Sequence, residues 1–212
     1  MSDLDSLIQA RILQADLKAV DERFAEIGIS DMAGIIFLKG AIVALANVRD
    51  IERSLRPTYE DHPELAEIIR PVKKNLEFVY YLRNKFVGHI HRDLIDKALE
   101  WKPELRYLAP HLGDSKAVVL TNIFVLETAI NTYVDKDQRH KVFESETDLA
   151  YPPDMARFLA FLEVSVRTSI DYLDSYCATI SKRIAVPDPK EFDLELWLKA
   201  GKTKFGFLAK RP

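Results

Sequence analysis

The stretch AGIIFLKGAIVALANV, residues 33–48, is the most apolar run in the chain and is interrupted by Lys39. As a helix it would be apolar almost all round, which is typical of a helix in the centre of a fold. The run itself is too short to span a bilayer. We therefore expect a buried central helix that starts after Ser30 and continues to about Leu55, where Pro57 stops it.

On both sides of this stretch, apolar residues recur every three or four positions, which is the helical period. Glycine is scarce, at 7 of 212 residues, and most of the 10 prolines fall between the periodic segments. The sequence therefore predicts a nearly all-α fold, at least about 60% helical. The other expected helices are Asp3–Ile27 capped by Ser2 and ended by Gly28, a helix from Pro63 to Phe86 kinked at Pro71, Arg92–Trp101, Lys116–Val134, Asp154–Ile184 and a short one in the tail.

Three short stretches complete this outline. We expect RPTYEDHP (residues 56–63) and PELRYLAPHLGDS (residues 103–115) to be irregular. The β-branched run AVVLTNIFV (residues 117–125) leaves a strand as an alternative to helix. We divide the chain into one helical domain, residues 1–185, and a C-terminal extension, residues 186–212, with a short helix and a basic end.

Composition limits the classes of function. Hydrophobic residues make up 48% of the chain, which is enough for a sizeable core. With 30 Lys+Arg against 33 Asp+Glu, the net charge of -3 argues against nonspecific coating of nucleic acid but permits a local basic site. The single cysteine, Cys177, excludes an internal disulfide framework and suits a reducing cytosol. The N-terminus is unlike a signal peptide, so we expect a cytoplasmic protein without a membrane partner.

Arg83 is a cation at an apolar position of the third expected helix. At 100° per residue it lies about 40° from Val79, inside the apolar stripe, whereas Lys85 lies about 240° away on the solvated face. A guanidinium cannot escape burial by losing its charge, so it needs an acceptor. Three interpretations are open. Arg83 pairs with a buried carboxylate, extends past the helix end, or lines a cleft or subunit interface that holds an anion.

His89 follows Gly88 at the end of the same helix. Glycine favours the left-handed conformation that terminates helices, and this conformation would turn His89 back towards the helix end, within reach of Arg83. The helix dipole at that end favours a protonated histidine. The simpler interpretation is that Gly-His is a cap with a surface histidine.

The sequence RNKFVGH, residues 83–89, resembles the signature of HEPN domains (higher eukaryotes and prokaryotes nucleotide-binding). That signature joins an arginine, a polar residue and a histidine, which here are Arg83, Asn84 and His89. The phrase LRNK..GH, followed at once by another helix, is similar to HEPN proteins linked to phage abortive infection. The detailed match is short, about twenty residues.

The resemblance implies a HEPN-like helical bundle that cleaves RNA without a metal or cofactor, as a homodimer with both motifs in one composite cleft. His89 would transfer protons at the 2′-hydroxyl and the 5′-oxygen, Arg83 would hold the phosphate, and Asn84 would orient one of them. We expect Lys85 and His91 to bind RNA, and His91 to be able to share the role of His89. Such a protein would be a toxin or phage-defence effector, restrained by a regulatory or antitoxin partner.

A second hypothesis follows from family members that have lost catalysis. The protein would then be a helical interaction module that binds a protein or RNA partner, with Arg83 paired to a buried acid and His89 acting as a cap. The basic tail leaves further alternatives, because it could contact RNA, dock on the body or on a second subunit, or form a disordered end. Its cations are Lys199, Lys202, Lys204, Lys210 and Arg211.

Overall fold

The computed structural model of the chain describes residues 2–24, 31–111, 113–184 and 194–202. Of these residues, 80% are helical, and among them there is no strand, only an isolated bridge between Val134 and His140. The prediction of an all-α fold is therefore confirmed. The β-branched run at residues 117–125 is helical.

The elements are helices of very different lengths, most of them joined by short turns, whereas residues 132–151 connect α7 to α8 without a helix. Their bounds are α1 Asp3–Phe24, α2 Met32–Leu55, η1 Arg56–Glu60, α3 Pro63–Ile69, η2 Arg70–Val72, α4 Lys73–Leu82, η3 Arg83–Val87, α5 Arg92–Trp101, α6 Leu105–Leu108, η4 Ala109–His111, α7 Ser115–Asn131, α8 Pro152–Ser181 and α9 Leu194–Gly201. The element η3 is a π-helix, whereas η1, η2 and η4 are 3₁₀-helices.

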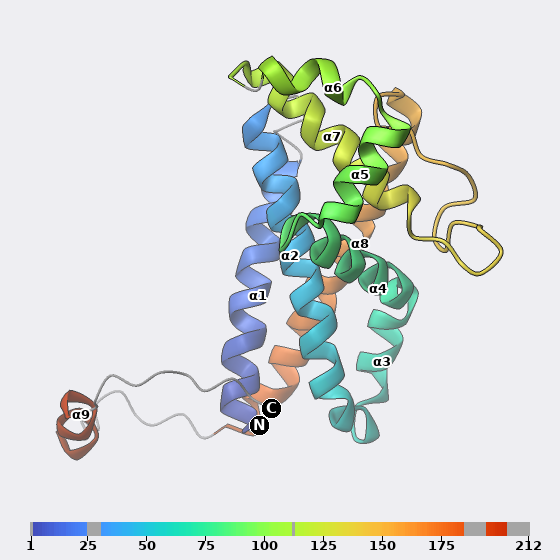
Figure 1. Cartoon of the computed structure of the whole chain (residues 1–212). Coiled ribbons are helices and arrows are strands. Elements are labelled where there is room, and N and C mark those ends of the chain that lie inside the picture. Colours follow the sequence, from blue (N-terminus) through green and yellow to red (C-terminus); the bar gives the residue numbers. More distant parts are fainter. Residues whose placement is uncertain (1, 25–30, 112, 185–193, 203–212) are drawn as a thin grey trace.

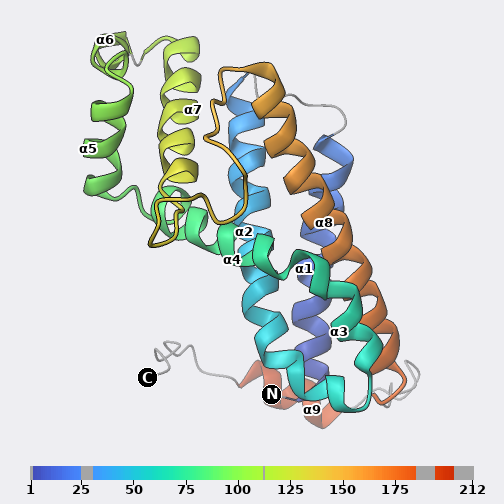
Figure 2. The same ribbon diagram turned by 90° about the vertical axis from the view of Figure 1, so that its right-hand side faces the viewer.

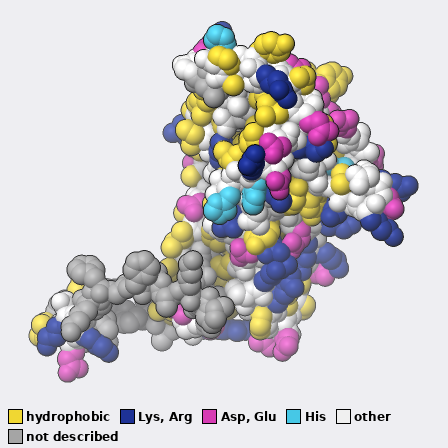
Figure 3. Space-filling model, viewed as in Figure 1, with side chains coloured by type: hydrophobic (Ala, Val, Ile, Leu, Met, Phe, Trp, Pro, Cys, Tyr) yellow, Lys and Arg dark blue, Asp and Glu magenta, His cyan; other side chains and the backbone are white. Residues whose placement is uncertain are grey.

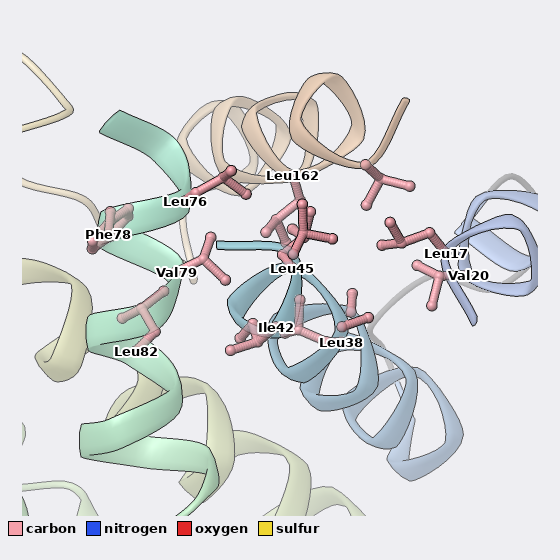
Figure 4. Packing of buried hydrophobic residues seen from close by; sticks show 14 of the residues in the cluster. Leu17, Val20, Leu38, Ile42, Leu45, Leu76, Phe78, Val79, Leu82 and Leu162 are labelled. Atoms are coloured by element: carbon pink, nitrogen blue, oxygen red, sulfur yellow. The ribbon is translucent and has the colours of Figure 1, made fainter. Parts of the chain in front are cut away.

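The helix α2 occupies the centre of the bundle (Figures 1 and 2). It packs against α1, α4, α7 and α8, while α5 packs on α7 at one end of the molecule. Leu38, Ile42 and Leu45 of α2 are completely or almost completely buried between side chains of α1, α4 and α8 (Figure 4). The expected central helix is thus present, and its apolar character on nearly all sides is explained by its neighbours.

Among the described residues, one helical stretch, Met32–Glu60, is long and apolar enough to cross a membrane on length and composition alone. It is 29 residues long because η1 follows α2 without a break. Half of its most apolar window (50%) is buried inside the fold, as the central position of α2 requires.

The helix starts follow the capping residues. Ser2 Oγ accepts a hydrogen bond from the Asp5 backbone N–H at 3.1 Å, and Asp5 Oδ2 accepts one from the Ser2 N–H at 3.1 Å. Asp31 caps α2 by accepting from the Gly34 N–H at 2.8 Å. Ser2 is therefore the cap that we predicted. Ile27 and Gly28, the predicted end of α1, lie outside the described residues.

Several predicted boundaries were wrong. Residues 56–63 hold the 3₁₀-helix η1 rather than a loop, and residues 103–115 contain α6 and η4. Pro71 does interrupt its helix, because it lacks an N–H and lies in the 3₁₀ turn between α3 and α4. The helix α7 ends at Asn131, three residues before Val134, and α8 covers Pro152–Ser181 instead of Asp154–Ile184.

Candidate functional site

The segment that carries the motif is a single π-helical turn that continues α4. The Gly88 N–H donates to the Arg83 carbonyl oxygen at 2.7 Å, five residues back. Gly88 has φ -75° and ψ -37°, so the predicted left-handed conformation is wrong. A Cβ at this position would lie 3.2 Å from the Arg83 carbonyl oxygen, which is tighter than ordinary contact. The glycine is explained by this close approach of the backbone to itself.

Four exposed residues, Gly88 to His91, connect the π-turn to α5. The His91 N–H donates to the Lys85 carbonyl oxygen at 3.5 Å, and α5 begins at the next residue. The imidazole rings of His89 and His91 are 6.3 Å apart, centroid to centroid. Figure 3 shows two histidine side chains next to each other on the face seen in Figure 1. His89 is thus at the surface immediately beyond the helix end.

Arg83 is partly buried, whereas Leu82 and Phe86 beside it are almost fully buried. Its Nη1 donates to Asn84 Oδ1 at 3.1 Å. In the described part of the chain, no carboxylate oxygen lies within 4.0 Å of its guanidinium nitrogens. The ion pair that one interpretation of Arg83 requires is therefore not present, and Asn84 holds the guanidinium from the adjacent position.

Lys85 and His91 line one pocket of about 170 Å³ beside the π-turn, together with Asp93 and Lys97 of α5. Tyr81, which also lines it, donates from its hydroxyl to Thr132 Oγ1 at 3.0 Å. Lys85 is partly buried, so its predicted place on the solvated face is wrong. The prediction assumed α-helical spacing, whereas a π-turn advances each residue by a smaller angle.

Sequence reasoning missed Lys39 of α2 as a residue of this region. Its ammonium donates to Asn122 Oδ1 at 2.6 Å and lies 4.8 Å from the centroid of the Phe86 ring in the π-turn. Burial lowers the pKa of Lys39 below its ordinary value. The signal was present in the sequence, because Lys39 is the charge that interrupts the most apolar run.

Pairing of charge separates this region from the rest of the described chain. In the whole described part of the chain, eight lysine and arginine side chains are partly buried. Five of these eight form ion pairs with carboxylates. Those five are Arg49, Lys73, Lys97, Lys102 and Arg157. The other three, Lys39, Arg83 and Lys85, have no carboxylate within 4.0 Å. Arg83 and Lys85 lie in the π-turn and Lys39 contacts it, so the partly buried cations without carboxylate partners gather at the motif.

No group of three or more His, Cys, Asp or Glu side chains that could hold a metal ion is found among the described residues. Comparisons of the chain with protein-family models, curated proteins and solved structures found no match. The resemblance to HEPN domains therefore rests on the motif and on its position at a helix end in an all-α chain.

Proposed function

We propose that the protein is a metal-independent endoribonuclease of the HEPN type, with Arg83, Asn84 and His89 as its catalytic residues. The observation that carries the proposal is the gathering of partly buried, carboxylate-free cations at the motif. A partly desolvated cation needs an anionic partner, and elsewhere in the described chain the protein supplies one. At the motif, an RNA phosphate is the partner that matches this charge.

The chemistry requires two proton transfers and one site for a negatively charged phosphate. The 2′-oxygen attacks the phosphorus, the bond to the 5′-oxygen breaks, and the products are a 2′,3′-cyclic phosphate and a 5′-hydroxyl. An imidazole takes the 2′-hydroxyl proton, and an acid returns a proton to the 5′-oxygen. His89 is exposed and can reach a bound strand. Arg83, oriented by Asn84, is suited to the equatorial phosphate oxygens.

The second proton-transfer group comes from one of two sources. In the homodimer that we propose, the second copy of His89 faces the first across a composite cleft. Ile90, exposed between the two histidines at 59%, is an apolar side chain that such an interface would cover. Alternatively, His91 of the same chain, with its ring 6.3 Å away, supplies the second group. Lys85 and His91 would also bind RNA through the pocket that they line.

The non-catalytic interaction module remains the second candidate. Its ion pair at Arg83 is not observed, but an exposed surface with basic residues would also suit binding of RNA without cleavage. A cytoplasmic toxin or phage-defence role, with a regulatory or antitoxin partner, belongs to the same proposal as catalysis.

Cleavage of total RNA in the presence of a metal chelator tests the proposal. Wild-type protein should produce fragments that end in a 2′,3′-cyclic phosphate, and His89→Ala should cleave about 10²–10⁴-fold more slowly because a proton-transfer group is lost. His111→Ala is the matched control, since His111 is an exposed histidine in η4, outside the motif. It should retain full activity.

Two results would contradict the proposal. Wild-type protein that cuts no RNA but binds it would favour the interaction module. Equal activity of His89→Ala and wild type would remove His89 from the mechanism, and a simultaneous loss in His91→Ala would assign the role to His91.

A further inference from the structure

A cavity of about 710 Å³ lies beside the segment that connects α7 to α8, residues 132–151. Trp101, the last residue of α5, lines it and is 42% exposed. His140 and Phe143, whose rings stack at 5.1 Å, line it as well. Glu144 and Glu146 add two exposed carboxylates. We call this space the Trp101 cavity, and its volume falls within the range of ligand-binding pockets, about 300–1,000 Å³.

Hydrogen bonds hold the connecting segment in place although it contains no helix. Asn131 Nδ2 donates to the Thr147 carbonyl oxygen at 2.8 Å, and the Thr147 N–H donates back to Asn131 Oδ1 at 2.9 Å. Arg157 of α8 donates to Ser145 Oγ at 2.8 Å and to the Glu146 carbonyl oxygen at 3.2 Å. The wall of the cavity that carries the carboxylates is therefore formed before any ligand binds.

The Trp101 cavity adjoins the pocket at the motif. Asn131 lines the cavity, and the next residue, Thr132, lines the pocket together with Lys85. Lys97, which also lines the pocket, lies one helical turn before Trp101, and its ammonium is 5.2 Å from the centroid of the Trp101 ring. The pocket and the cavity therefore meet along α5 and the end of α7.

Lys97 is available to a ligand at this junction. It donates to Glu100 at 2.7 Å, and the exposed fractions of the two side chains are 39% and 63%. An ion pair this exposed contributes little to stability, so a phosphate can replace the carboxylate.

The pocket and the cavity differ in charge. Two lysines and one carboxylate line the pocket, whereas two carboxylates, Glu144 and Glu146, and one arginine line the cavity. Neither carboxylate has a Lys, Arg or His nitrogen within 4.0 Å in the part of the chain that the structure describes. A nucleotide has two matching parts, because its phosphate suits lysines and the amino group of its base donates to carboxylates. The carboxylates repel phosphate, so a base is the part of RNA that the cavity admits.

We propose that the Trp101 cavity binds one base of the RNA substrate, which stacks on Trp101 while Lys97 holds a phosphate of the same strand. Glu144 or Glu146 accepts a hydrogen bond from the exocyclic amino group of that base. Adenine, cytosine and guanine carry such a group and uracil does not, so the cavity selects against uracil.

The cavity recognises a base at a distance from the bond that is cut. Trp101 follows His91 by ten residues, which corresponds to about 15 Å along α5. The bound base therefore lies a few nucleotides from the scissile phosphate. This inference rests on the proposed function for its substrate class, but it requires only that the protein binds RNA, not that it cleaves RNA.

Tryptophan fluorescence of the full-length chain tests the stacking directly. The chain has two tryptophans, so Trp197→Phe leaves Trp101 as the only one that emits. The probes are 2′-O-methyl oligonucleotides of adenine or of uracil, of equal length, which lack the attacking hydroxyl and are not cut. The adenine strand should quench Trp101 and should bind at least about fivefold more tightly than the uracil strand.

Variants of Trp101 measure the contribution of its ring to affinity. Trp101→Ala should bind a labelled adenine strand at least about fivefold more weakly, as measured by fluorescence anisotropy. Trp101→Phe keeps an aromatic face and should bind nearly as well as wild type, which separates stacking from a fault in folding. Tyr107→Ala is the matched control, since Tyr107 is an aromatic residue of α6 exposed at 79%, outside the cavity. It should bind as wild type does.

The carboxylates are tested by the preference between the two strands. Glu144→Gln/Glu146→Gln removes both charges, and the ratio of the two affinities should fall towards one. Asp16→Asn/Glu22→Gln is the matched control, because it removes two exposed acids of α1. It should keep the wild-type ratio.

Three results would overturn the inference. A bound adenine strand that leaves Trp101 unquenched and binds Trp101→Ala as tightly as wild type would mean that no base enters the cavity. Adenosine monophosphate that quenches Trp101 at the same concentration as the strand would assign the cavity to free nucleotides. Absence of RNA binding by wild type would overturn both this inference and the proposed function. By contrast, the expected quenching by a protein that cuts no RNA would support the base site and remove catalysis alone.

Discussion

Two regions of the bundle contain charged side chains that are buried or partly buried, one around Glu52 and one around Arg83. The two regions differ in whether these charges have oppositely charged partners. Glu52 is buried, and its carboxylate accepts from Arg56 at 3.0 Å, from Lys73 at 3.1 Å and from the Tyr59 hydroxyl at 3.1 Å. Burial raises the pKa of Glu52, but the bonds from Arg56 and Lys73 outweigh burial and hold it below its ordinary value. Arg83 has only the neutral oxygen of Asn84 within bonding distance among the described residues.

This difference in charge pairing indicates different roles for the two regions. At Glu52 the protein supplies every partner itself, so the cluster is complete in a single chain and stabilises the fold. At Arg83, Lys85 and Lys39 the cations come without counter-charges, which costs stability unless a ligand supplies them. Mutations in the two regions should therefore separate, with the first affecting stability and the second affecting function.

Between these two regions, the largest expected effect of a mutation is that of Arg83→Ala. Arg83→Ala should slow RNA cleavage by about 10²–10³-fold, the cost of removing one group that stabilises transition-state charge. The melting temperature should hardly change, because no carboxylate loses its partner. Cleavage assays and thermal melting on the same protein preparation measure both effects. A large drop in melting temperature with no wild-type cleavage would instead place Arg83 in a structural role.

Glu52→Gln is the corresponding mutation in the other region, and its expected effect is the next largest. It removes the charge that Arg56 and Lys73 share, and we expect a loss of about 1–3 kcal/mol in the free energy of unfolding. The loss stays below that of a fully buried pair because both cations are partly exposed to water. Denaturant titration measures it. Cleavage per folded molecule should equal that of wild type, and a selective loss of activity would break the contrast between the regions.

Much of the fold could be predicted because helical periodicity and caps act locally. Arg92–Trp101 was predicted with both ends correct, and Ser2 caps α1 as expected. The missed elements, η1, α6 and η4, are single turns too short to show a period. The expected division at residue 185 stays a prediction, as does the place of the tail beyond residue 202.

The site was predictable only as a set of residue types in a row. Gly88 was correctly singled out, but its conformation was wrong, because a sequence does not reveal that a helix widens into a π-turn. Because of the same turn, Lys85 lines a pocket, whereas α-helical spacing predicted it on the solvated face. Lys39 was missed because its link to the motif is tertiary, through the Phe86 ring and Asn122. The homodimer, RNA as the substrate and the metal independence stay predictions.

A smaller effect, on RNA binding, is expected from mutation of Lys39. Lys39→Met removes a partly buried cation whose pKa burial lowers, so the melting temperature should stay the same or rise. RNA binding should weaken, and the slope of log affinity against log salt should fall by about 1 if Lys39 contacts a phosphate. Lys73→Met is the matched control, since it removes a similar lysine that pairs with Glu52. It should lower the melting temperature and leave the salt slope unchanged.

Lys85→Ala should have only a mild effect on cleavage.

The smallest expected effect is the pH dependence of stability at His140, a histidine whose hydrogen-bond partners are backbone groups of the fold. Its Nδ1 accepts from the N–H groups of Val142 at 3.1 Å and Phe143 at 2.8 Å, so Nε2 carries the proton and donates to the Ile130 carbonyl oxygen at 3.0 Å. Burial lowers the pKa of His140 below 6.5, with the charge of Arg157 acting in the same direction.

Because the folded-state pKa is lower, the unfolded chain binds the proton first as the pH falls below about 6.5. The stability from His140 is therefore present above that pH and is lost as the pH falls towards the folded-state pKa. Melting temperatures measured at about pH 7.5 and about pH 5.5 should differ less in His140→Gln than in wild type. Phe143→Leu disturbs the same aromatic cluster without a titratable group, so it should lower both temperatures and keep the wild-type difference. An unchanged difference in His140→Gln would mean that other groups control the acid sensitivity of the fold.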